Sequence, residues 1–209
     1  METVRITGKN RLSGEVRLQG AKNSALPILA AAASVDGVNV IHNCPRLSDV
    51  DAAIKILRFI GCKVEREGDT VTVDATDVSR CDVPRELMCE MRSSVIFLSP
   101  LLARLGMAEI SAPGGCEIGL RPIDLHLSSL RLMGAQIETE GKVAVIKGVE
   151  TLTGACVCAA DLRAGTALAV AGLAAQGSTT IENVCLIDRG WQDMEEKLRS
   201  LGAEIERES

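Results

Sequence analysis

The stretch Leu57-Arg58-Phe59-Ile60-Gly61 decides the fold, because its pattern returns twice later in the chain. It recurs as Leu130-Arg131-Leu132-Met133-Gly134 and as Leu198-Arg199-Ser200-Leu201-Gly202. Each copy is followed by an alternating stretch typical of a strand, at residues 62–65, 135–138 and 203–206. A pattern that returns at long intervals indicates a repeated structural unit. We therefore interpret the chain as three copies of one unit.

A second match extends the repeat toward the N-terminus. Leu12-Ser13-Gly14 corresponds to Leu152-Thr153-Gly154, 140 positions later. At the same offset, the glycines at 37 and 177 match, and so do the asparagines at 43 and 183. The three units then cover about residues 12–80, 84–150 and 151–209, so we expect residues 1–209 to form one lobe.

Each unit is predicted to contain two helices and several short strands. An Ala- and Leu-rich helix is expected at 25–34, 94–105 and 166–175, and each ends at a glycine, which suits a helix stop. A strand follows at 38–41, 108–110 and 179–181, before an amphipathic helix and a last alternating strand. The pattern predicts an α/β fold, a pseudo-threefold repeat of β-α-β-α-β units with helices inward and sheets outside. A dinucleotide-binding fold is not supported, because no Gly-x-Gly-x-x-Gly turn is present.

The composition limits the classes of partner. Phe59, Phe97 and Trp191 are the only aromatic residues among 209, so the core must be aliphatic. So few aromatic side chains argue against a stacking surface for single-stranded nucleic acid. The net charge of −5 argues against binding of a phosphate backbone, so we expect no nucleic-acid partner.

Membrane, metal and redox features are equally sparse. No apolar run approaches the ~18 residues of a membrane span, and the N-terminus has no apolar signal core. Eight cysteines without a secretory signal are typical of reduced thiols, so a cytoplasmic location is expected. With only His42 and His126 and no Cys-x-x-Cys pair, we expect no metal site and no cofactor. Cys156 and Cys158 are expected to pack on one side of a strand.

The middle unit differs from the other two in one connection. The glycines that follow its two predicted helices, at 106 and 134, are 28 residues apart, against 24 and 25 in the other units. The excess falls in Ser111–Pro122. Lengthened loops on a repeated scaffold are frequent places for function. Cys116 lies in this loop and can act there as a nucleophile or proton donor, with Arg121 five residues on. An incidental surface thiol is the alternative interpretation.

Four basic residues lie at corresponding helix starts of the repeat: Lys22, Arg92, Arg121 and Arg189. A helix start favours anions, and Asn23 adds an amide donor beside Lys22. Together these positions predict convergence on one face, which would suit a substrate with several anionic oxygens. Taken alone, Lys22 is more simply interpreted as an exposed lysine.

These residues resemble the bacterial UDP-N-acetylglucosamine enolpyruvyl transferases. The matching motifs are Gly20–Asn23, Met91–Ser94, Pro113–Gly119 and Arg121–His126, and the resemblance covers essentially the whole chain. It implies an inside-out, barrel-like α/β lobe and a transferase activity. The reaction would move the enolpyruvyl group of phosphoenolpyruvate to the 3-hydroxyl of UDP-N-acetylglucosamine, the first committed step of peptidoglycan precursor synthesis. The related enolpyruvylshikimate-phosphate synthases do not use this cysteine loop, so Cys116 argues against them.

The resemblance also implies a role for each matching residue. Cys116 would be the general acid that protonates the methylene carbon of phosphoenolpyruvate, and it could form a covalent adduct with that substrate. Phosphoenolpyruvate would be bound by Lys22, Asn23, Arg121 and Arg189. UDP-N-acetylglucosamine would be contacted by Arg92, Arg121, Pro122, Ile123, Asp124 and Leu125.

The family has two lobes of three units each, with the substrates in the cleft between them. The first two units here resemble the first two of the family, and the third, with Asp161-Leu162-Arg163 and Ile187–Trp191, resembles the last. The aspartate that the family uses as base belongs to units without a counterpart in this chain. Three hypotheses therefore stay open: a transferase, a non-catalytic lobe that binds phosphoenolpyruvate or UDP-sugar weakly, and a folded remnant without function. Self-association is a further route to a cleft.

Overall fold

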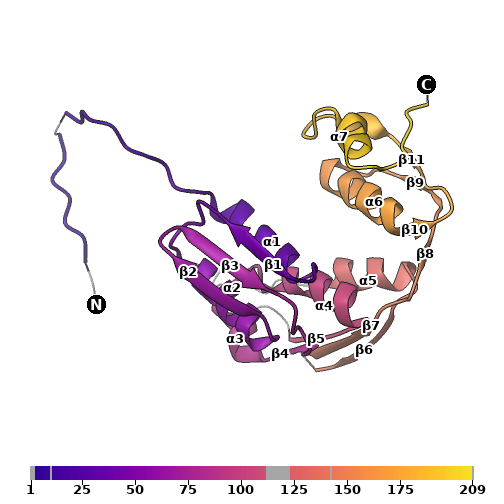
Figure 1. Cartoon of the computed structure of the whole chain (residues 1–209), viewed down its shortest axis with the longest axis horizontal. Helices are drawn as coiled ribbons and strands as arrows, with labels where there is room; N and C mark the ends of the chain where they lie inside the picture. The colour runs from indigo at the N-terminus through magenta and orange to yellow at the C-terminus, as the bar shows by residue number, and fades with distance from the viewer. Residues whose placement is uncertain (1–2, 10, 112–122, 142, 209) are drawn as a thin grey trace. The chain divides into compact units, whose positions relative to one another are not determined.

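A computed structural model describes residues 3–9, 11–111, 123–141 and 143–208 (Figure 1). The residues group into two compact units. The first comprises Met1–Pro122 with Glu138–Val145, and the second comprises Ile123–Ile137 with Ile146–Ser209. Cys116, Arg121 and Pro122 lie outside the described residues.

The first unit begins with a helix-strand-helix segment and a hairpin. Its elements are α1 (Lys22–Ala32), β1 (Val38–Ile41), α2 (Ser48–Phe59), β2 (Lys63–Glu67) and β3 (Thr70–Asp74). The strands form an antiparallel sheet in the order β1-β3-β2. Alternation in β3 buries Val71 and Val73 completely, and α1 packs against α2.

A second group of helices and strands completes this unit. It contains β4 (Asp82–Val83), α3 (Arg85–Glu90), the 3₁₀ helix η1 (Ser94–Phe97), α4 (Leu98–Leu105) and β5 (Met107–Ser111). With β6 (Gln136–Glu140) and β7 (Val143–Lys147), these strands form a sheet in the order β4-β5-β7-β6. Apart from Phe97, the buried hydrophobic side chains of the described residues are Ala, Leu, Ile, Val, Met and Cys, so the expected aliphatic core is confirmed.

The second unit has less regular structure. Its elements are α5 (Asp124–Leu132), β8 (Leu152–Thr153), β9 (Cys156–Cys158), α6 (Leu162–Ala174), β10 (Ala175–Gln176), β11 (Thr180–Glu182), η2 (Val184–Leu186) and α7 (Met194–Ser200). The strands pair in parallel as β8 with β10 and β9 with β11. A small core of Ala169, Ile187, Met194 and Leu198 holds the unit, with Trp191 packed against it.

The second helix of each sequence repeat ends in the same way. The N–H groups of residues 62, 135 and 203 donate to the carbonyls of residues 57, 130 and 198, at 2.9, 2.9 and 3.0 Å. The glycines between them, Gly61, Gly134 and Gly202, have φ of 113°, 98° and 94°. This is the Schellman ending, in which a left-handed residue turns the chain off the helix. The repeat seen in the sequence therefore produces a repeated hydrogen-bond pattern.

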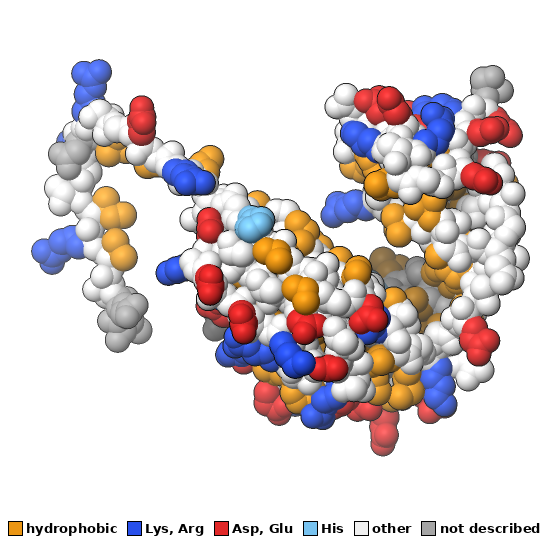
Figure 2. Space-filling view, viewed as in Figure 1, with side chains coloured by type: hydrophobic (Ala, Val, Ile, Leu, Met, Phe, Trp, Pro, Cys, Tyr) orange, Lys and Arg blue, Asp and Glu red, His pale blue; other side chains and the backbone are white. Residues whose placement is uncertain are grey.

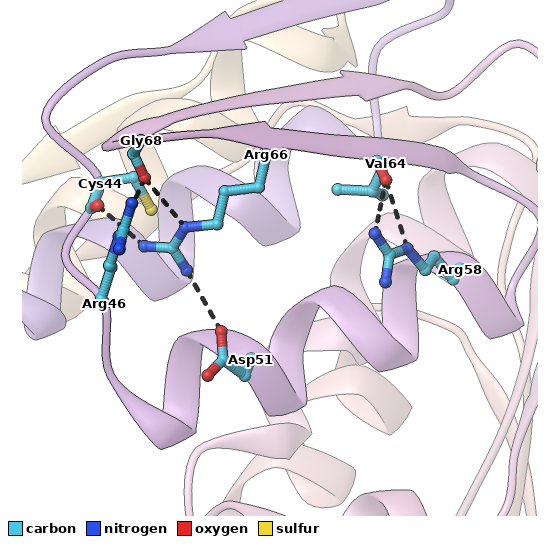
Figure 3. Close-up of polar contacts among 7 residues, drawn as sticks. All are labelled: Cys44, Arg46, Asp51, Arg58, Val64, Arg66 and Gly68. Carbon is cyan, nitrogen blue, oxygen red and sulfur yellow. Dashed lines mark hydrogen bonds and ion pairs between the residues drawn. The ribbon is translucent and has the colours of Figure 1, made fainter.

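The arginine of the same motif adds a second shared contact. Arg58 donates from Nε and Nη2 to the carbonyl oxygen of Val64, at 3.3 and 2.7 Å (Figure 3). Arg199 donates from Nε to the carbonyl oxygen of Ile205 at 2.9 Å. Both arginines reach six residues along the chain, so each one ties the helix end to the segment that follows it.

Most of the predicted elements are confirmed. The three Ala- and Leu-rich helices correspond to α1, to η1 with α4, and to α6, and the strands after them to β1, β5 and β11. The strand predicted at 203–206 is wrong. The strands β2 and β6 each pair with a following strand, β3 or β7, whereas no described strand follows residues 203–206. Packing of Cys156 and Cys158 is also wrong, because both side chains are exposed.

The first and third repeats consequently depart from the predicted β-α-β-α-β order. In the first, the described residues before α1 contain no strand, and in the third the last strand is missing from the described residues. The α/β content itself is confirmed.

Replacing Gly61 by Ala should unfold the first unit more readily than the same change at Gly37. At Gly61 a Cβ would lie 2.5 Å from the carbonyl oxygen of Asp77, whereas at Gly37 it would meet nothing within 4 Å. Both residues have positive φ, 113° and 99°. We expect Gly37→Ala to cost about 1 kcal/mol from backbone strain, and Gly61→Ala to cost about 3 kcal/mol because a clash is added. Urea unfolding measures both, and equal losses would contradict the clash.

Candidate functional site

Lys22 is the first residue of α1, and its amine lies 2.9 Å from Oδ2 of Asp49 in the first turn of α2. The Lys22 side chain is 48% exposed and that of Asp49 is 26% exposed. An ion pair open to water contributes little to stability. Lys22 can therefore exchange this carboxylate for another anion at small cost.

The start of α1 is also open to an anion. Ala21 precedes the helix and has no side chain that could cap it, and the first turn contains no acidic residue. The start of α6 is different, because Oδ1 of Asp161 accepts from the N–H groups of Arg163 and Ala164 at 2.7 and 2.9 Å. These hydrogen bonds lower the pKa of Asp161. Asp161 is thus a helix cap for α6, whereas the first backbone N–H groups of α1 have no side-chain cap.

Arg92 lies in the turn between α3 and η1, and its side chain is exposed. Two residues on, Ser94 is fully buried, and its hydroxyl donates to the carbonyl oxygen of Met88 at 2.8 Å. This internal bond fixes the turn on which Arg92 stands. Within the described residues Arg92 has no ion pair, so its guanidinium is available to a ligand.

Arg189 is exposed and follows η2 in the second unit. The residue before it, Asp188, is held by a bidentate pair from Arg207, with N–O distances of 3.0 and 2.7 Å. Nε of Arg207 also donates to Glu195 at 2.6 Å. The guanidinium lowers the pKa values of both carboxyl groups. The segment that carries Arg189 is therefore tied down, while Arg189 itself stays exposed.

Other arginines serve the fold rather than a ligand. Arg66 is only 17% exposed, pairs with Asp51 at 3.2 Å, and donates to the carbonyls of Cys44 and Gly68 (Figure 3). Arg46 donates to the same Gly68 carbonyl at 3.3 Å. With its donors committed to Asp51 of α2 and to the carbonyls of Cys44 and Gly68, Arg66 is unsuited to substrate binding. Over the visible face of the first unit, acidic and basic side chains are interspersed (Figure 2).

Of the described cysteines, Cys81 and Cys89 are of intermediate burial, and the others are either buried or exposed. Cys44 and Cys62 are buried, and burial raises the pKa of Cys62 to about 11 and that of Cys44 in the same direction. Cys156, Cys158 and Cys185 are exposed. Neither buried thiol can supply a proton to a substrate, because neither is accessible.

The second unit contains an open groove of about 620 Å³ between α5, the strands β8 and β9, and α6. Leu132, Met133, Leu152, Val157 and Leu168 line it with small residues, and no lining residue carries a charge. An apolar groove without a cation does not suit phosphate or carboxylate groups. It is therefore separate from the anion-binding chemistry predicted above.

The predicted site residues are distributed over both units. Lys22, Asn23 and Arg92 are exposed in the first unit. In the second unit, Asp124 and Leu125 are exposed in the first turn of α5, Ile123 is half-buried before it, and Arg189 is exposed. Cys116, Arg121 and Pro122 lie outside the described residues, so the predicted convergence of the four basic residues stays a prediction.

Asp49 is the residue that sequence reasoning missed. It stands 27 positions from Lys22, and only the contact between α1 and α2 brings the two together. Its place in the first turn of a helix is common for an acidic residue and gave no specific signal. Among the described residues there is no group of three or more potential metal ligands. No described helix is long and apolar enough to cross a membrane.

A family model described as EPSP synthase (3-phosphoshikimate 1-carboxyvinyltransferase) matches residues 6–147 and 139–198. UDP-N-acetylglucosamine 1-carboxyvinyltransferase 2 of Caldanaerobacter subterraneus subsp. tengcongensis is 45% identical over 206 residues, 98% of this chain and 49% of the relative. The UDP-N-acetylglucosamine 1-carboxyvinyltransferase of Photorhabdus laumondii subsp. laumondii is 42% identical over 207 residues, with the same shares covered. The chain spans about half the length of the curated relatives it matches.

Two solved structures have a similar fold. The enolpyruvyl transferase NikO from Streptomyces tendae matches with a TM-score of 0.69 at 27% identity, covering 95% of this chain and 47% of that chain. An EPSP synthase from Acinetobacter baumannii matches with a TM-score of 0.60 at 22% identity, covering 93% and 45%. The second likeness concerns the fold alone.

Alkylation should separate the described cysteines by burial. At pH 8 a thiol with a pKa of about 11 is ionised in about one molecule in a thousand, and the thiolate is the reactive form. We expect iodoacetamide to modify Cys156, Cys158 and Cys185 in the folded protein. Cys44 and Cys62 should react only after urea is added. Peptide mass spectrometry measures each site, and equal labelling of Cys62 and Cys185 without urea would contradict the burial.

Proposed function

Because this chain belongs to the EPSP synthase (3-phosphoshikimate 1-carboxyvinyltransferase) family, we propose that it carries the proton-donating part of an enolpyruvyl transfer site. The group moves from phosphoenolpyruvate to the 3-hydroxyl of UDP-N-acetylglucosamine, in peptidoglycan precursor synthesis in the cytoplasm. The observation that carries the proposal is 45% identity over 98% of the chain to a relative named for this transfer. The Cys116 loop, which lengthens the middle unit, supports the same branch of the family.

In the proposed reaction Cys116 is the general acid. Its thiol gives a proton to C3 of phosphoenolpyruvate, while the sugar 3-hydroxyl oxygen attacks C2 and passes its own proton to a base. The resulting tetrahedral ketal expels phosphate, and loss of a proton from the new methyl group restores the double bond. Arg121, Arg189 and Lys22 would offset the charge on the phosphate and carboxylate groups.

The geometry of α1 supports phosphate binding at Lys22 and Asn23. The amine of Lys22 is paired only with the partly exposed Asp49, and the helix start has no capping side chain. An incoming phosphate can replace Asp49 at the amine and accept from the first N–H groups of the helix. Arg92 and the start of α5 would contact the nucleotide sugar, as the resemblance implies.

We also propose that the three repeats form a pseudo-threefold lobe. Three helix ends with the same left-handed glycine and the same hydrogen bond support three equivalent units. Such a lobe would present helix starts, and hence the basic residues there, on one face. A second copy of the chain is one way to build the opposite side of a cleft.

A second candidate function is binding without turnover. The chain spans about half the length of its curated relatives, and the base that the resemblance implies has no counterpart in it. A lobe without its opposite side leaves bound substrate open to water and poorly oriented, which slows chemistry by orders of magnitude. Such a lobe would still hold phosphoenolpyruvate weakly.

Phosphate release from phosphoenolpyruvate in the presence of UDP-N-acetylglucosamine tests the transferase. We expect Cys116→Ala to lower the rate by about 100-fold or more, because a positioned general acid contributes that much. Cys185→Ala is the matched control, since Cys185 is exposed but belongs to η2. Background release from the unmodified chain would rule out the transferase and leave the binding function.

Calorimetric titration with phosphoenolpyruvate tests the binding site shared by both functions. Lys22→Ala should weaken binding about tenfold, because a charge-assisted hydrogen bond to the phosphate is lost. Lys55→Ala is the matched control, since Lys55 pairs with Glu90 at 2.7 Å and has a similar exposure. Equal affinity in the Lys22→Ala variant and the unmodified chain would overturn the site at α1.

A further inference from the structure

The strand β1 has one unpaired edge. It pairs with β3 on one side, and the strand order β1-β3-β2 leaves no described strand on the other. Ala75 donates to the carbonyl of Gly37 at 2.9 Å, so residue 37 and every second residue after it face β3. The N–H and C=O groups of Val38, Val40 and His42 therefore point to the unpaired edge. Val38 and Val40 are more than half exposed.

The corresponding edge is occupied in the other two repeats. In the second, β4 lies parallel to β5, with Val83 opposite Ile110. In the third, β9 lies parallel to β11, with Val157 opposite Ile181. In both cases the added strand is the segment that leads into the first helix of its own repeat. The first repeat is the exception within the described part of the chain.

The 140-residue offset of the repeat identifies the segment that fits the β1 edge. Shifting β9 and β11 back by 140 gives residues 16–18 opposite residues 40–42. The flanking hydrogen bonds of the third repeat run from Thr180 N–H to Ala155 and from Ala159 N–H to Glu182. Shifted likewise, the N–H of Val40 would donate to the carbonyl of Glu15, and the N–H of Gln19 would donate to the carbonyl of His42. Residues 40 and 42 are the ones that the β1–β3 pairing turns toward the unpaired edge.

The chain already lies beside this edge at its C-terminal end. A Cβ on Gly20 would overlap the carbonyl oxygen of Asn43, so the two backbones are in direct contact just after β1. Before Gly20 the described residues form no strand, and Leu12, Val16 and Leu18 are 92%, 88% and 84% exposed. Figure 2 shows hydrophobic side chains standing out along this N-terminal segment.

We propose that residues 15–19 add to the unpaired edge of β1 as a parallel strand. The strand, α1 and β1 then form a β-α-β crossover, the arrangement that the other two repeats already have. Val16 takes its place beside Val40 on the outer side of the sheet. Arg17 takes the place that Val157 has in the third repeat, facing the helices.

The same edge offers a template to another chain, because unpaired strands add to exposed edges. The close approach of Gly20 to Asn43 favours the segment of the same chain. It is already held at the C-terminal end of the edge, so only five residues have to be ordered. A strand exchanged with a second copy would be concentration-dependent.

Hydrogen exchange of the full chain tests the strand. We expect the amides of Val40 and Gln19 to exchange at least about tenfold more slowly than freely exposed amides, independently of protein concentration. Arg17→Pro removes an N–H that the pairing directs at β1, so protection of Val40 should be lost. Val16→Pro is the matched control, because its N–H points away from β1 and an edge strand tolerates such a proline.

Arg17→Val tests the register of the proposed strand. The substitution places a valine in the first repeat where the third repeat has Val157, facing the helices. Protection of Val40 should therefore rise above that of the unmodified chain. Fast exchange of Val40 in the unmodified chain would overturn the proposal. Protection that grows with protein concentration would overturn it as well, in favour of a second copy at the edge. Equal effects of the two proline variants would overturn the register.

Discussion

The rest of the structure depends on the left-handed glycine that ends the second helix of each repeat. A helix that continued past Gly61, Gly134 or Gly202 would carry the next apolar residues away from the core. The Schellman hydrogen bond reverses the chain there. In the first and third repeats the arginine three residues before the glycine, Arg58 or Arg199, also donates to a carbonyl of the segment that follows. At Gly61 two constraints exclude a side chain: the positive φ, and the backbone of Asp77, which occupies the place of a Cβ.

The sequence predicted the helices well because their signals are local. Apolar spacing and a terminal glycine lie within one segment, and α1, α4 and α6 follow them closely. Strands need a partner as well as a pattern. Residues 203–206 alternate as residues 62–65 do, but only the latter have a neighbouring strand to pair with, in β3. The alternation at 203–206 therefore places Ala203 and Ile205 on the core without making a strand.

The candidate site was harder to predict, because residue type does not show whether a charged side chain bonds to the protein's own backbone or is free to bind a ligand. Arg58 and Arg66 belong to the same class as Arg92 and Arg189, yet the first two give their donors to backbone carbonyls. Burial distinguishes only Arg66, which is 17% exposed; Arg58 is exposed and differs from Arg92 and Arg189 by its hydrogen bonds to the carbonyl of Val64. Lys22 combines both situations, since it is paired but exposed, and its partner Asp49 comes from a different helix. A sequence motif can identify such a lysine as a candidate ligand-binding residue. Only the packing of α1 on α2 supplies the carboxylate that a ligand must displace.

The N-terminal segment affects both the sheet of the first repeat and the candidate anion site, because it leads from the edge of β1 to the start of α1. Gly20 stands between the proposed strand at residues 15–19 and the first residue of α1, Lys22. If that strand is added to β1, the approach to Lys22 is fixed on both sides, by the sheet before it and the helix after it. If it is not, an incoming anion must order the approach as it binds, and part of the binding free energy is spent on that ordering. The third repeat illustrates the fixed case, because β9 leads into α6 and Asp161 occupies the helix start. In the first repeat the cap is absent, so the same geometry would leave the helix start to a ligand.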